Sequence, residues 1–228
     1  MEYVMAIDLG QSRDYTAVAI LKKEEQQAKK SFKWEMLRKA VLDDEADEDG
    51  RTVDRVVGGN SRKTILNLGY LSRFALGTSY VDITRDVALL LGREPYKGKT
   101  QLVVDKTGVG IAVVDMMRDA GLDPVPVTIT GGQNVGGQSW GEGYTVPKRD
   151  LVAALSCALQ QYRLKIQKDL KLAPLFVKEA ANFRYKISAS GHDTYDSARE
   201  SVHDDIVLSV AIGTWYCDFA GAGLQIFI

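Results

Sequence analysis

The sequence predicts an α/β fold in which a mixed β-sheet is flanked by helices. Three strand-like segments come first: a hairpin over residues 4–22 and a third strand over residues 62–71. From residue 78 onward, helical patterns alternate with apolar strands, and no internal repeat is visible. An antiparallel start followed by strand–helix alternation is typical of sheets that mix strand directions and carry helices on their faces.

Composition indicates an ordinary globular protein, and we expect residues 1–228 to form a single domain. The chain has 228 residues, of which 45% are hydrophobic and 26% charged, enough to bury a sizeable core. It has no apolar run of ~20 residues and no signal-peptide pattern, so neither a membrane span nor secretion is expected. Cys157 and Cys217 lie in apolar helical patterns and are predicted to be reduced core residues of a cytoplasmic protein. With only two histidines beside them, no structural zinc site is expected.

The net charge of −1 argues against a strongly electropositive nucleic-acid binder. The charge is uneven, because residues 43–49 (DDEADED) are almost all acidic and read as a solvated loop. A pair of bound divalent cations would make the sum positive. A metal-dependent DNA or RNA enzyme therefore stays open.

The first hairpin, residues 4–22, carries the most informative residue of the chain. Its first strand is a short apolar run that ends in Asp8, and the turn-prone residues 11–14 lead into a second apolar run. A carboxylate at the end of a buried strand is costly unless something pairs with it. A divalent cation is one such partner, and a hydrogen-bonded turn or a helix cap is another.

Residues 22–60 are polar and irregular, and we expect a surface insertion. Residues 58–64 (GGNSRKT) resemble a phosphate loop only faintly, since Arg62 stands where that motif needs glycine, and they are predicted to be a turn before a strand. The following helix is expected to be capped by Thr78 or Ser79 and to end at Gly92.

A second apolar strand, residues 101–105, again ends in an aspartate, Asp105. A helix over residues 111–120 and a strand over residues 124–129 are predicted to follow. Residues 130–144 contain six glycines, and we expect a flexible loop without regular structure.

The last third of the chain is predicted to be mainly helical. Helices are expected over residues 148–162, with Pro147 in the first turn, and over residues 170–182. Residues 183–188 and those after residue 191 are predicted to form a C-terminal hairpin. Asp204 and Asp205 open a final apolar helix, where acidic residues are also explained by capping.

Two strands that end in aspartate and a helix that opens with two more aspartates are together a candidate site. Neighbouring strands lie about 5 Å apart, so carboxylates at adjacent strand ends are able to share a pair of cations. Two-metal phosphoryl-transfer sites need such hard oxygen ligands. This requires the final helix to point its N-terminus at the strand ends.

This layout resembles the ribonuclease H-like nucleases, and more closely the nuclease domain of bacteriophage terminase large subunits. The resemblance covers most of the chain outside residues 22–60. It is carried by IDLGQSRDYTAVAIL (7–21), LVVDKTGVG (102–110), VPKRDLVAAL (146–155) and HDDIVLSVAI (203–212).

The resemblance implies a mixed five-stranded central sheet with helices on both faces. It implies metal-dependent endonuclease cleavage of concatemeric double-stranded viral DNA during genome packaging, with Mg²⁺ or Mn²⁺ in a two-ion site. The family's catalytic and metal-binding roles carry onto Asp8, Asp105, Asp205 and Asp204. The family's partners are a packaging ATPase, a portal and a small terminase subunit. Since this chain has no Walker A motif, we expect it to correspond to the nuclease half and not to the ATPase. The place of action would be the host cell cytoplasm.

Basic residues near these motifs are candidate DNA contacts. Lys148 and Arg149 open a helix, and Arg184 and Lys186 lie on the predicted hairpin; ordinary surface exposure explains them equally well. His203 fits a proton carrier or an outer metal ligand, although a plain surface histidine is the simpler interpretation.

Three other functions fit parts of the pattern. An actin- or hexokinase-like phosphotransferase also begins with a strand, Asp-x-Gly and a hairpin, but it needs two such domains. A Holliday-junction resolvase of the same fold would act as a dimer on branched DNA. A non-catalytic binding module of the same fold is a third alternative, and the presence of every carboxylate expected of a nuclease argues against it.

Overall fold

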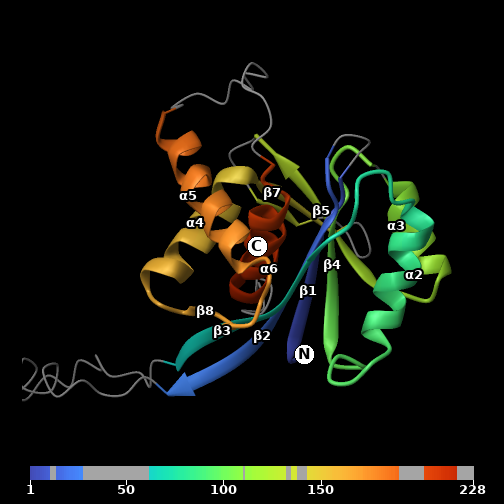
Figure 1. Ribbon diagram of the computed structural model, residues 1–228, viewed down its shortest axis with the longest axis horizontal. Coiled ribbons are helices and arrows are strands. Elements are labelled where there is room, and N and C mark those ends of the chain that lie inside the picture. Colours follow the sequence, from blue (N-terminus) through green and yellow to red (C-terminus); the bar gives the residue numbers. More distant parts are fainter. Residues whose placement is uncertain are drawn as a thin grey trace, which may run out of the picture.

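The computed structural model describes residues 1–10, 14–27, 62–109, 111–131, 135–137, 143–189 and 203–219. Within these residues one eight-stranded sheet lies between two layers of helices (Figure 1). The strands are β1 (Tyr3–Asp8), β2 (Ala17–Gln27), β3 (Arg62–Arg73), β4 (Thr100–Asp105), β5 (Pro124–Thr130), β6 (Gly136–Gly137), β7 (Tyr144–Pro147) and β8 (Leu164–Ile166). The helices are α2 (Tyr80–Leu91), α3 (Ile111–Asp119), α4 (Lys148–Gln160), α5 (Ala173–Ala189) and α6 (Asp205–Phe219).

Strand β1 lies in the middle of the sheet, whose order is β6-β7-β5-β4-β1-β2-β3-β8. It pairs antiparallel with β2 and parallel with β4, while β2 pairs antiparallel with β3 and β4 parallel with β5. These five strands are the predicted central sheet. Short strands extend it at both edges: β7 and β6 beyond β5, and β8 beyond β3.

The alternation of side chains along the strands separates two hydrophobic cores. In β1, Val4 and Ala6 pack in the core shared with α4, α5 and α6, whereas Met5 and Ile7 pack in the core shared with α2 and α3. Successive strand residues point to opposite faces, so a fully apolar strand fills both cores. Figure 1 shows the corresponding layers, with α2 and α3 on one side of the sheet and α4, α5 and α6 on the other.

Helix α6 is the centre of the second layer. Its residues from Asp205 to Cys217 are all buried, and it packs against β1 and β2. Gly213 permits the close approach: a Cβ there would collide with Leu21 Cδ1 and lie 3.2 Å from Ala6 Cβ. A helix that is apolar on every side belongs in a protein interior.

Ser79 confirms the predicted helix start, because its hydroxyl accepts the N–H of Asp82 at 3.1 Å, and Gly92 caps the other end of α2. Pro147 stands one residue before α4 as its cap, not inside the first turn. Cys217 is buried as expected, but Cys157 is exposed, since it lies off the apolar stripe of α4.

Three segments differ from the prediction. Residues 183–188 do not form a hairpin arm, because α5 continues through them as far as Ala189; the second arm falls outside the described residues. The insertion does not begin at residue 22, since β2 runs on to Gln27 opposite β3. Within the glycine-rich stretch, Gly136–Gly137 pairs with β7, so part of it is regular structure. Residues 28–61, with the acidic run, lie outside the described part of the chain.

Candidate active site

Asp8 and Asp105 are the last residues of two neighbouring parallel strands. The register of β1 and β4 places them directly opposite each other. Both point to the α6 face, because Ala6 and Val103, two residues earlier in each strand, lie in the core that contains α6. Both are buried, with 9% and 5% of their surface exposed. Two carboxylates thus meet at the carboxyl ends of β1 and β4.

The N-terminus of α6 brings two more carboxylates to this point. The charges of Asp105, Asp205 and Asp204 each act to raise the pKa of Asp8, so all three lie near that carboxylate. Residues about 100 positions apart in the chain therefore lie near one another, and whether they bind metal together stays a prediction. The elements responsible are two strand ends and one helix start.

The carboxylates are strongly perturbed by their surroundings. Burial, with repulsion from the neighbouring carboxylates, raises the pKa of Asp8 well above its ordinary range. Burial raises the pKa of Asp105 to about 6, opposed by the N–H of Thr107, which donates to its Oδ1 at 2.8 Å. Burial also raises the pKa of Asp205 to about 6, opposed by His203. Ionised carboxylates are costly here, so a bound cation would be strongly favoured.

The donor set fits an oxygen-preferring divalent cation. Asp205 Oδ2 and Glu179 Oε1 are buried atoms without a hydrogen-bond partner, and such atoms are rare unless a ligand or ion completes them. Among the described side chains, no group of three or more His, Cys, Asp and Glu residues already has the geometry to hold a metal ion. All four aspartates offer hard ligands of the kind that Mg²⁺ and Mn²⁺ prefer.

Lys148 lies beside the carboxylates. As the first residue of α4, it places Nζ 3.1 Å from Asp204 Oδ2, and its charge lowers the pKa values of Asp8 and Asp105. Arg149 is exposed and pairs with Asp150 at 3.5 Å. Of the two predicted DNA contacts on α4, Lys148 therefore reaches the acidic site.

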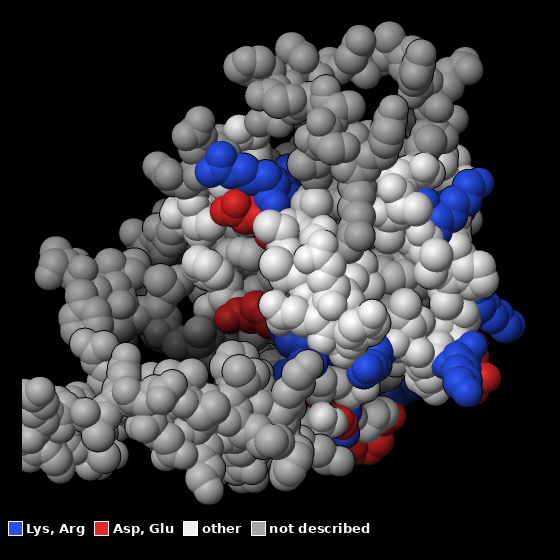
Figure 2. All heavy atoms as spheres, turned by 90° about the vertical axis from the view of Figure 1, so that its left-hand side faces the viewer, with Lys and Arg blue, Asp and Glu red and all other residues white. Residues whose placement is uncertain are grey.

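The other two predicted DNA contacts lie on a helix and not on the predicted hairpin. Arg184 and Lys186 lie in the last turns of α5 instead of on a hairpin. Figure 2 shows the face toward α4 and α5, where the described basic side chains form separate small groups, some of them with acidic side chains beside them. Within the described residues this face carries no broad basic surface.

His203 is not a plain surface residue. Its Nδ1 lies 3.9 Å from Asp205 Oδ2, and its side chain is 32% exposed. Its ring meets Tyr15 edge-on at 4.8 Å between centroids. The histidine therefore borders the site, and its ring packs nearly perpendicular to the ring of Tyr15.

Sequence reasoning missed three residues that adjoin the site. Glu179 on α5 is 2% exposed and accepts the N–H of Val207 at 3.0 Å; burial raises its pKa to about 7, with the N–H of Val207 acting in the opposite direction. Arg73, at the end of β3, has Nη1 4.0 Å from Glu179 Oε1. Its guanidinium lies over the ring of Tyr15, 3.9 Å from the centroid. A signal existed for Glu179, because it interrupts the apolar stripe of its helix formed by Phe176, Ala180 and Phe183.

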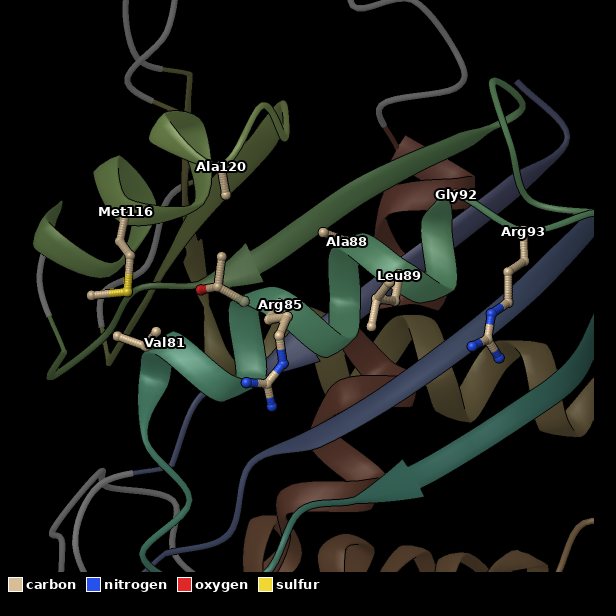
Figure 3. Close-up of a pocket in the computed structure, with 9 residues that line it drawn as sticks. Val81, Arg85, Ala88, Leu89, Gly92, Arg93, Met116 and Ala120 are labelled. Carbon is tan, nitrogen blue, oxygen red and sulfur yellow. The ribbon is translucent and has the colours of Figure 1, made fainter.

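A surface groove lies on the other side of the sheet. It has a volume of about 650 Å³ and is lined by α2 and α3, with Val81, Leu89 and Met116 among its residues (Figure 3). Both helices pack on the face opposite α6. The groove is therefore separate from the four aspartates, which lie at the ends of β1 and β4 and at the start of α6.

No protein-family model matches this chain, and no curated protein sequence matches it. The large terminase nuclease from thermophilic phage G20c is similar in structure, with a TM-score of 0.51 at 17% identity over 93% of this chain and 80% of that one. The same nuclease with bound zinc gives 0.50 at 20% identity, over 93% and 79%. The human cytomegalovirus terminase nuclease domain, Mn soaked, gives 0.49 at 13% identity, over 97% and 86%. The predicted mixed sheet with helices on both faces is thus confirmed, and the chain has the fold of the phage terminase nuclease.

Proposed function

We propose that the protein is a metal-dependent endonuclease that cleaves concatemeric double-stranded viral DNA during genome packaging. The observation that carries this proposal is the meeting of Asp8, Asp105, Asp204 and Asp205 at the ends of β1 and β4. The shared fold with a terminase nuclease agrees with it. No local motif brings these four residues together, and joint cation binding gives one reason for all of them.

Asp8, Asp105, Asp204 and Asp205 would hold the cations. The first two stand on strands, and the other two stand at the start of a helix. Asp8 and Asp105 stand on rigid strand ends in the sheet centre, which suits groups that must keep a fixed spacing. Asp204 and Asp205 come from the buried helix α6. A pair of Mg²⁺ or Mn²⁺ ions held there would make a water molecule more acidic and would offset the negative charge that develops on the leaving 3′ oxygen. The expected products carry 5′-phosphate and 3′-hydroxyl ends.

Two neighbouring residues would assist from the rim. Lys148, now 3.1 Å from Asp204, is placed to neutralise a phosphate oxygen once cations occupy the carboxylates. His203, beside Asp205, is placed to exchange protons with water at the edge of the site. Arg149, Arg184 and Lys186 would contact the DNA backbone farther out.

The wider setting follows from the same proposal. The partners would be double-stranded DNA, a packaging ATPase, a portal and a small terminase subunit, in the cytoplasm of the host cell. Within the described residues, no helix has both the length and the apolar character needed to cross a membrane.

A plasmid assay tests the proposal. Supercoiled DNA is incubated with the protein in Mn²⁺, in Mg²⁺ and in EDTA, with a synthetic four-way junction as a second substrate. We expect nicking and linearisation with either metal, none in EDTA and none by Asp8→Asn. The matched control is Asp115→Asn, an exposed aspartate on α3 that should leave cleavage unchanged. Full cleavage in EDTA or by Asp8→Asn would overturn the assignment, and cleavage of the junction alone would indicate a resolvase.

A further inference from the structure

The N-terminus of α6 lies inside the protein, where its first N–H groups need acceptors. Asp204 occupies the capping position, because its backbone carbonyl accepts the N–H of Leu208 at 2.9 Å. A side chain at that position usually accepts the N–H of the second or third helical residue. The third residue here is Val207, and its N–H donates to Glu179 Oε2 at 3.0 Å. The acceptor thus comes from another helix, α5.

This arrangement leaves the side chain of Asp204 available for other contacts. Its Oδ2 meets Lys148 Nζ at 3.1 Å, and its charge acts on Asp8. Asp205 likewise has a buried oxygen, Oδ2, without a hydrogen-bond partner. The Asp204 carboxylate therefore contacts Lys148, although it stands at the start of a helix whose backbone would otherwise attract it, and the charge of Asp205 also acts on Asp8.

Glu179 is held firmly enough to serve as a cap. It is 2% exposed, and its helix packs in the core through Phe176 and Phe183. Arg73 Nη1 lies 4.0 Å from Glu179 Oε1, and the guanidinium is itself placed over the ring of Tyr15. The supports come from α5, from the end of β3 and from Tyr15, two residues before β2, so no single loop controls the position of the carboxylate.

We propose that Glu179 is a positioning residue that caps α6 from outside and so keeps Asp204 and Asp205 directed at the cation site. This inference rests on the proposed metal-dependent function and extends it to a residue outside the four aspartates. Without Glu179, the free N–H of Val207 would draw the Asp204 carboxylate back onto its own helix. Loss of a group that orients metal ligands typically weakens metal binding by about 10–100-fold.

Calorimetric titration of Mn²⁺ into the metal-free protein, well below its melting temperature, tests the inference independently of cleavage. Glu179→Ala should bind Mn²⁺ about 10–100-fold more weakly than the wild type. Glu179→Gln keeps an oxygen that accepts the N–H of Val207 and should stay within about 3-fold of the wild type. Gly213→Ala perturbs the same helix two turns further on and should leave Mn²⁺ affinity unchanged, which separates positioning from general loss of stability.

A double-mutant cycle sharpens the result. If Glu179 acts by freeing Asp204, then Glu179→Ala should cost much less affinity in an Asp204→Asn background than in the wild type. Additive losses, wild-type affinity in Glu179→Ala, or a Gln variant as weak as the Ala variant would each overturn the inference while leaving the nuclease proposal standing. A wild-type protein that neither binds Mn²⁺ nor cleaves DNA would overturn both.

Discussion

Replacing Asp105 with asparagine is expected to stabilise the metal-free protein at pH 8 and to weaken its response to cations. Burial raises the pKa of Asp105 to about 6, against an ordinary value of 3.8. One pH unit in a pKa corresponds to about 1.4 kcal/mol, so ionising this group at pH 8 costs the folded state at most about 3 kcal/mol. Asparagine removes the charge and keeps an oxygen for the N–H of Thr107, 2.8 Å away.

The expected change is large enough for differential scanning calorimetry. In a domain of this size about 1 kcal/mol moves the Tm by about 2–4 °C, so the variant should gain up to roughly 6–12 °C in EDTA at pH 8. Added Mn²⁺ should raise its Tm less than that of the wild type, since one ligand is missing. Asp115→Asn serves as the exposed control. A Tm of the variant several degrees below that of the wild type in EDTA would contradict the expected cost of ionising Asp105. A rise in Tm with Mn²⁺ as large as that of the wild type would remove Asp105 from the site.

Three further outcomes are expected. Gly213→Ala should lower stability by about 1–3 kcal/mol by urea unfolding, because its Cβ meets Leu21 and Ala6; an unchanged midpoint would show that the helix has room to shift. Ser79→Ala should cost about 1 kcal/mol of stability and leave cleavage intact, because it removes only the cap of α2. Since the pKa values of Asp205 and Glu179 are raised to about 6 and 7, their stabilising contribution is complete below the unfolded values near 4 and lost as pH rises through 6–7. Metal-free Tm should therefore fall between pH 5 and pH 8, less so with Mn²⁺, and a Tm that rises over that range would contradict the burial of these groups.

The central strands and their aspartates were predictable because local patterns determine them. Asp8 and Asp105 each close an apolar strand, and the side-chain alternation then decides which face both carboxylates take. The helix that Asp205 opens is apolar enough to be recognised as buried. Its close packing against β1 at Gly213 depends on how the side chains of the two elements fit together, and the spacing of apolar residues does not reveal that fit.

Other parts depended on contacts between distant segments. Residues 183–188 alternate aromatic and basic side chains, which fits a strand, yet Phe183 continues the apolar stripe of α5 and the helix persists. Arg73 and Tyr15 meet because the pairing of β2 with β3 places Ala17 opposite Arg73. Glu179 was visible as a charge on an apolar stripe, but its partner at the start of α6 was not.

The place of α6 in the chain has a consequence for biosynthesis. It is the last described element in sequence order, yet it fills the middle of one helical layer. A ribosome makes the chain from its N-terminus, so the sheet face with Ala6 and Leu21 has no cover until this helix emerges. We therefore expect nascent chains to depend on chaperones until that point. Asp8 and Asp105 are without Asp205 over the same interval, so under the proposed function a partly synthesised chain would be unable to cleave DNA.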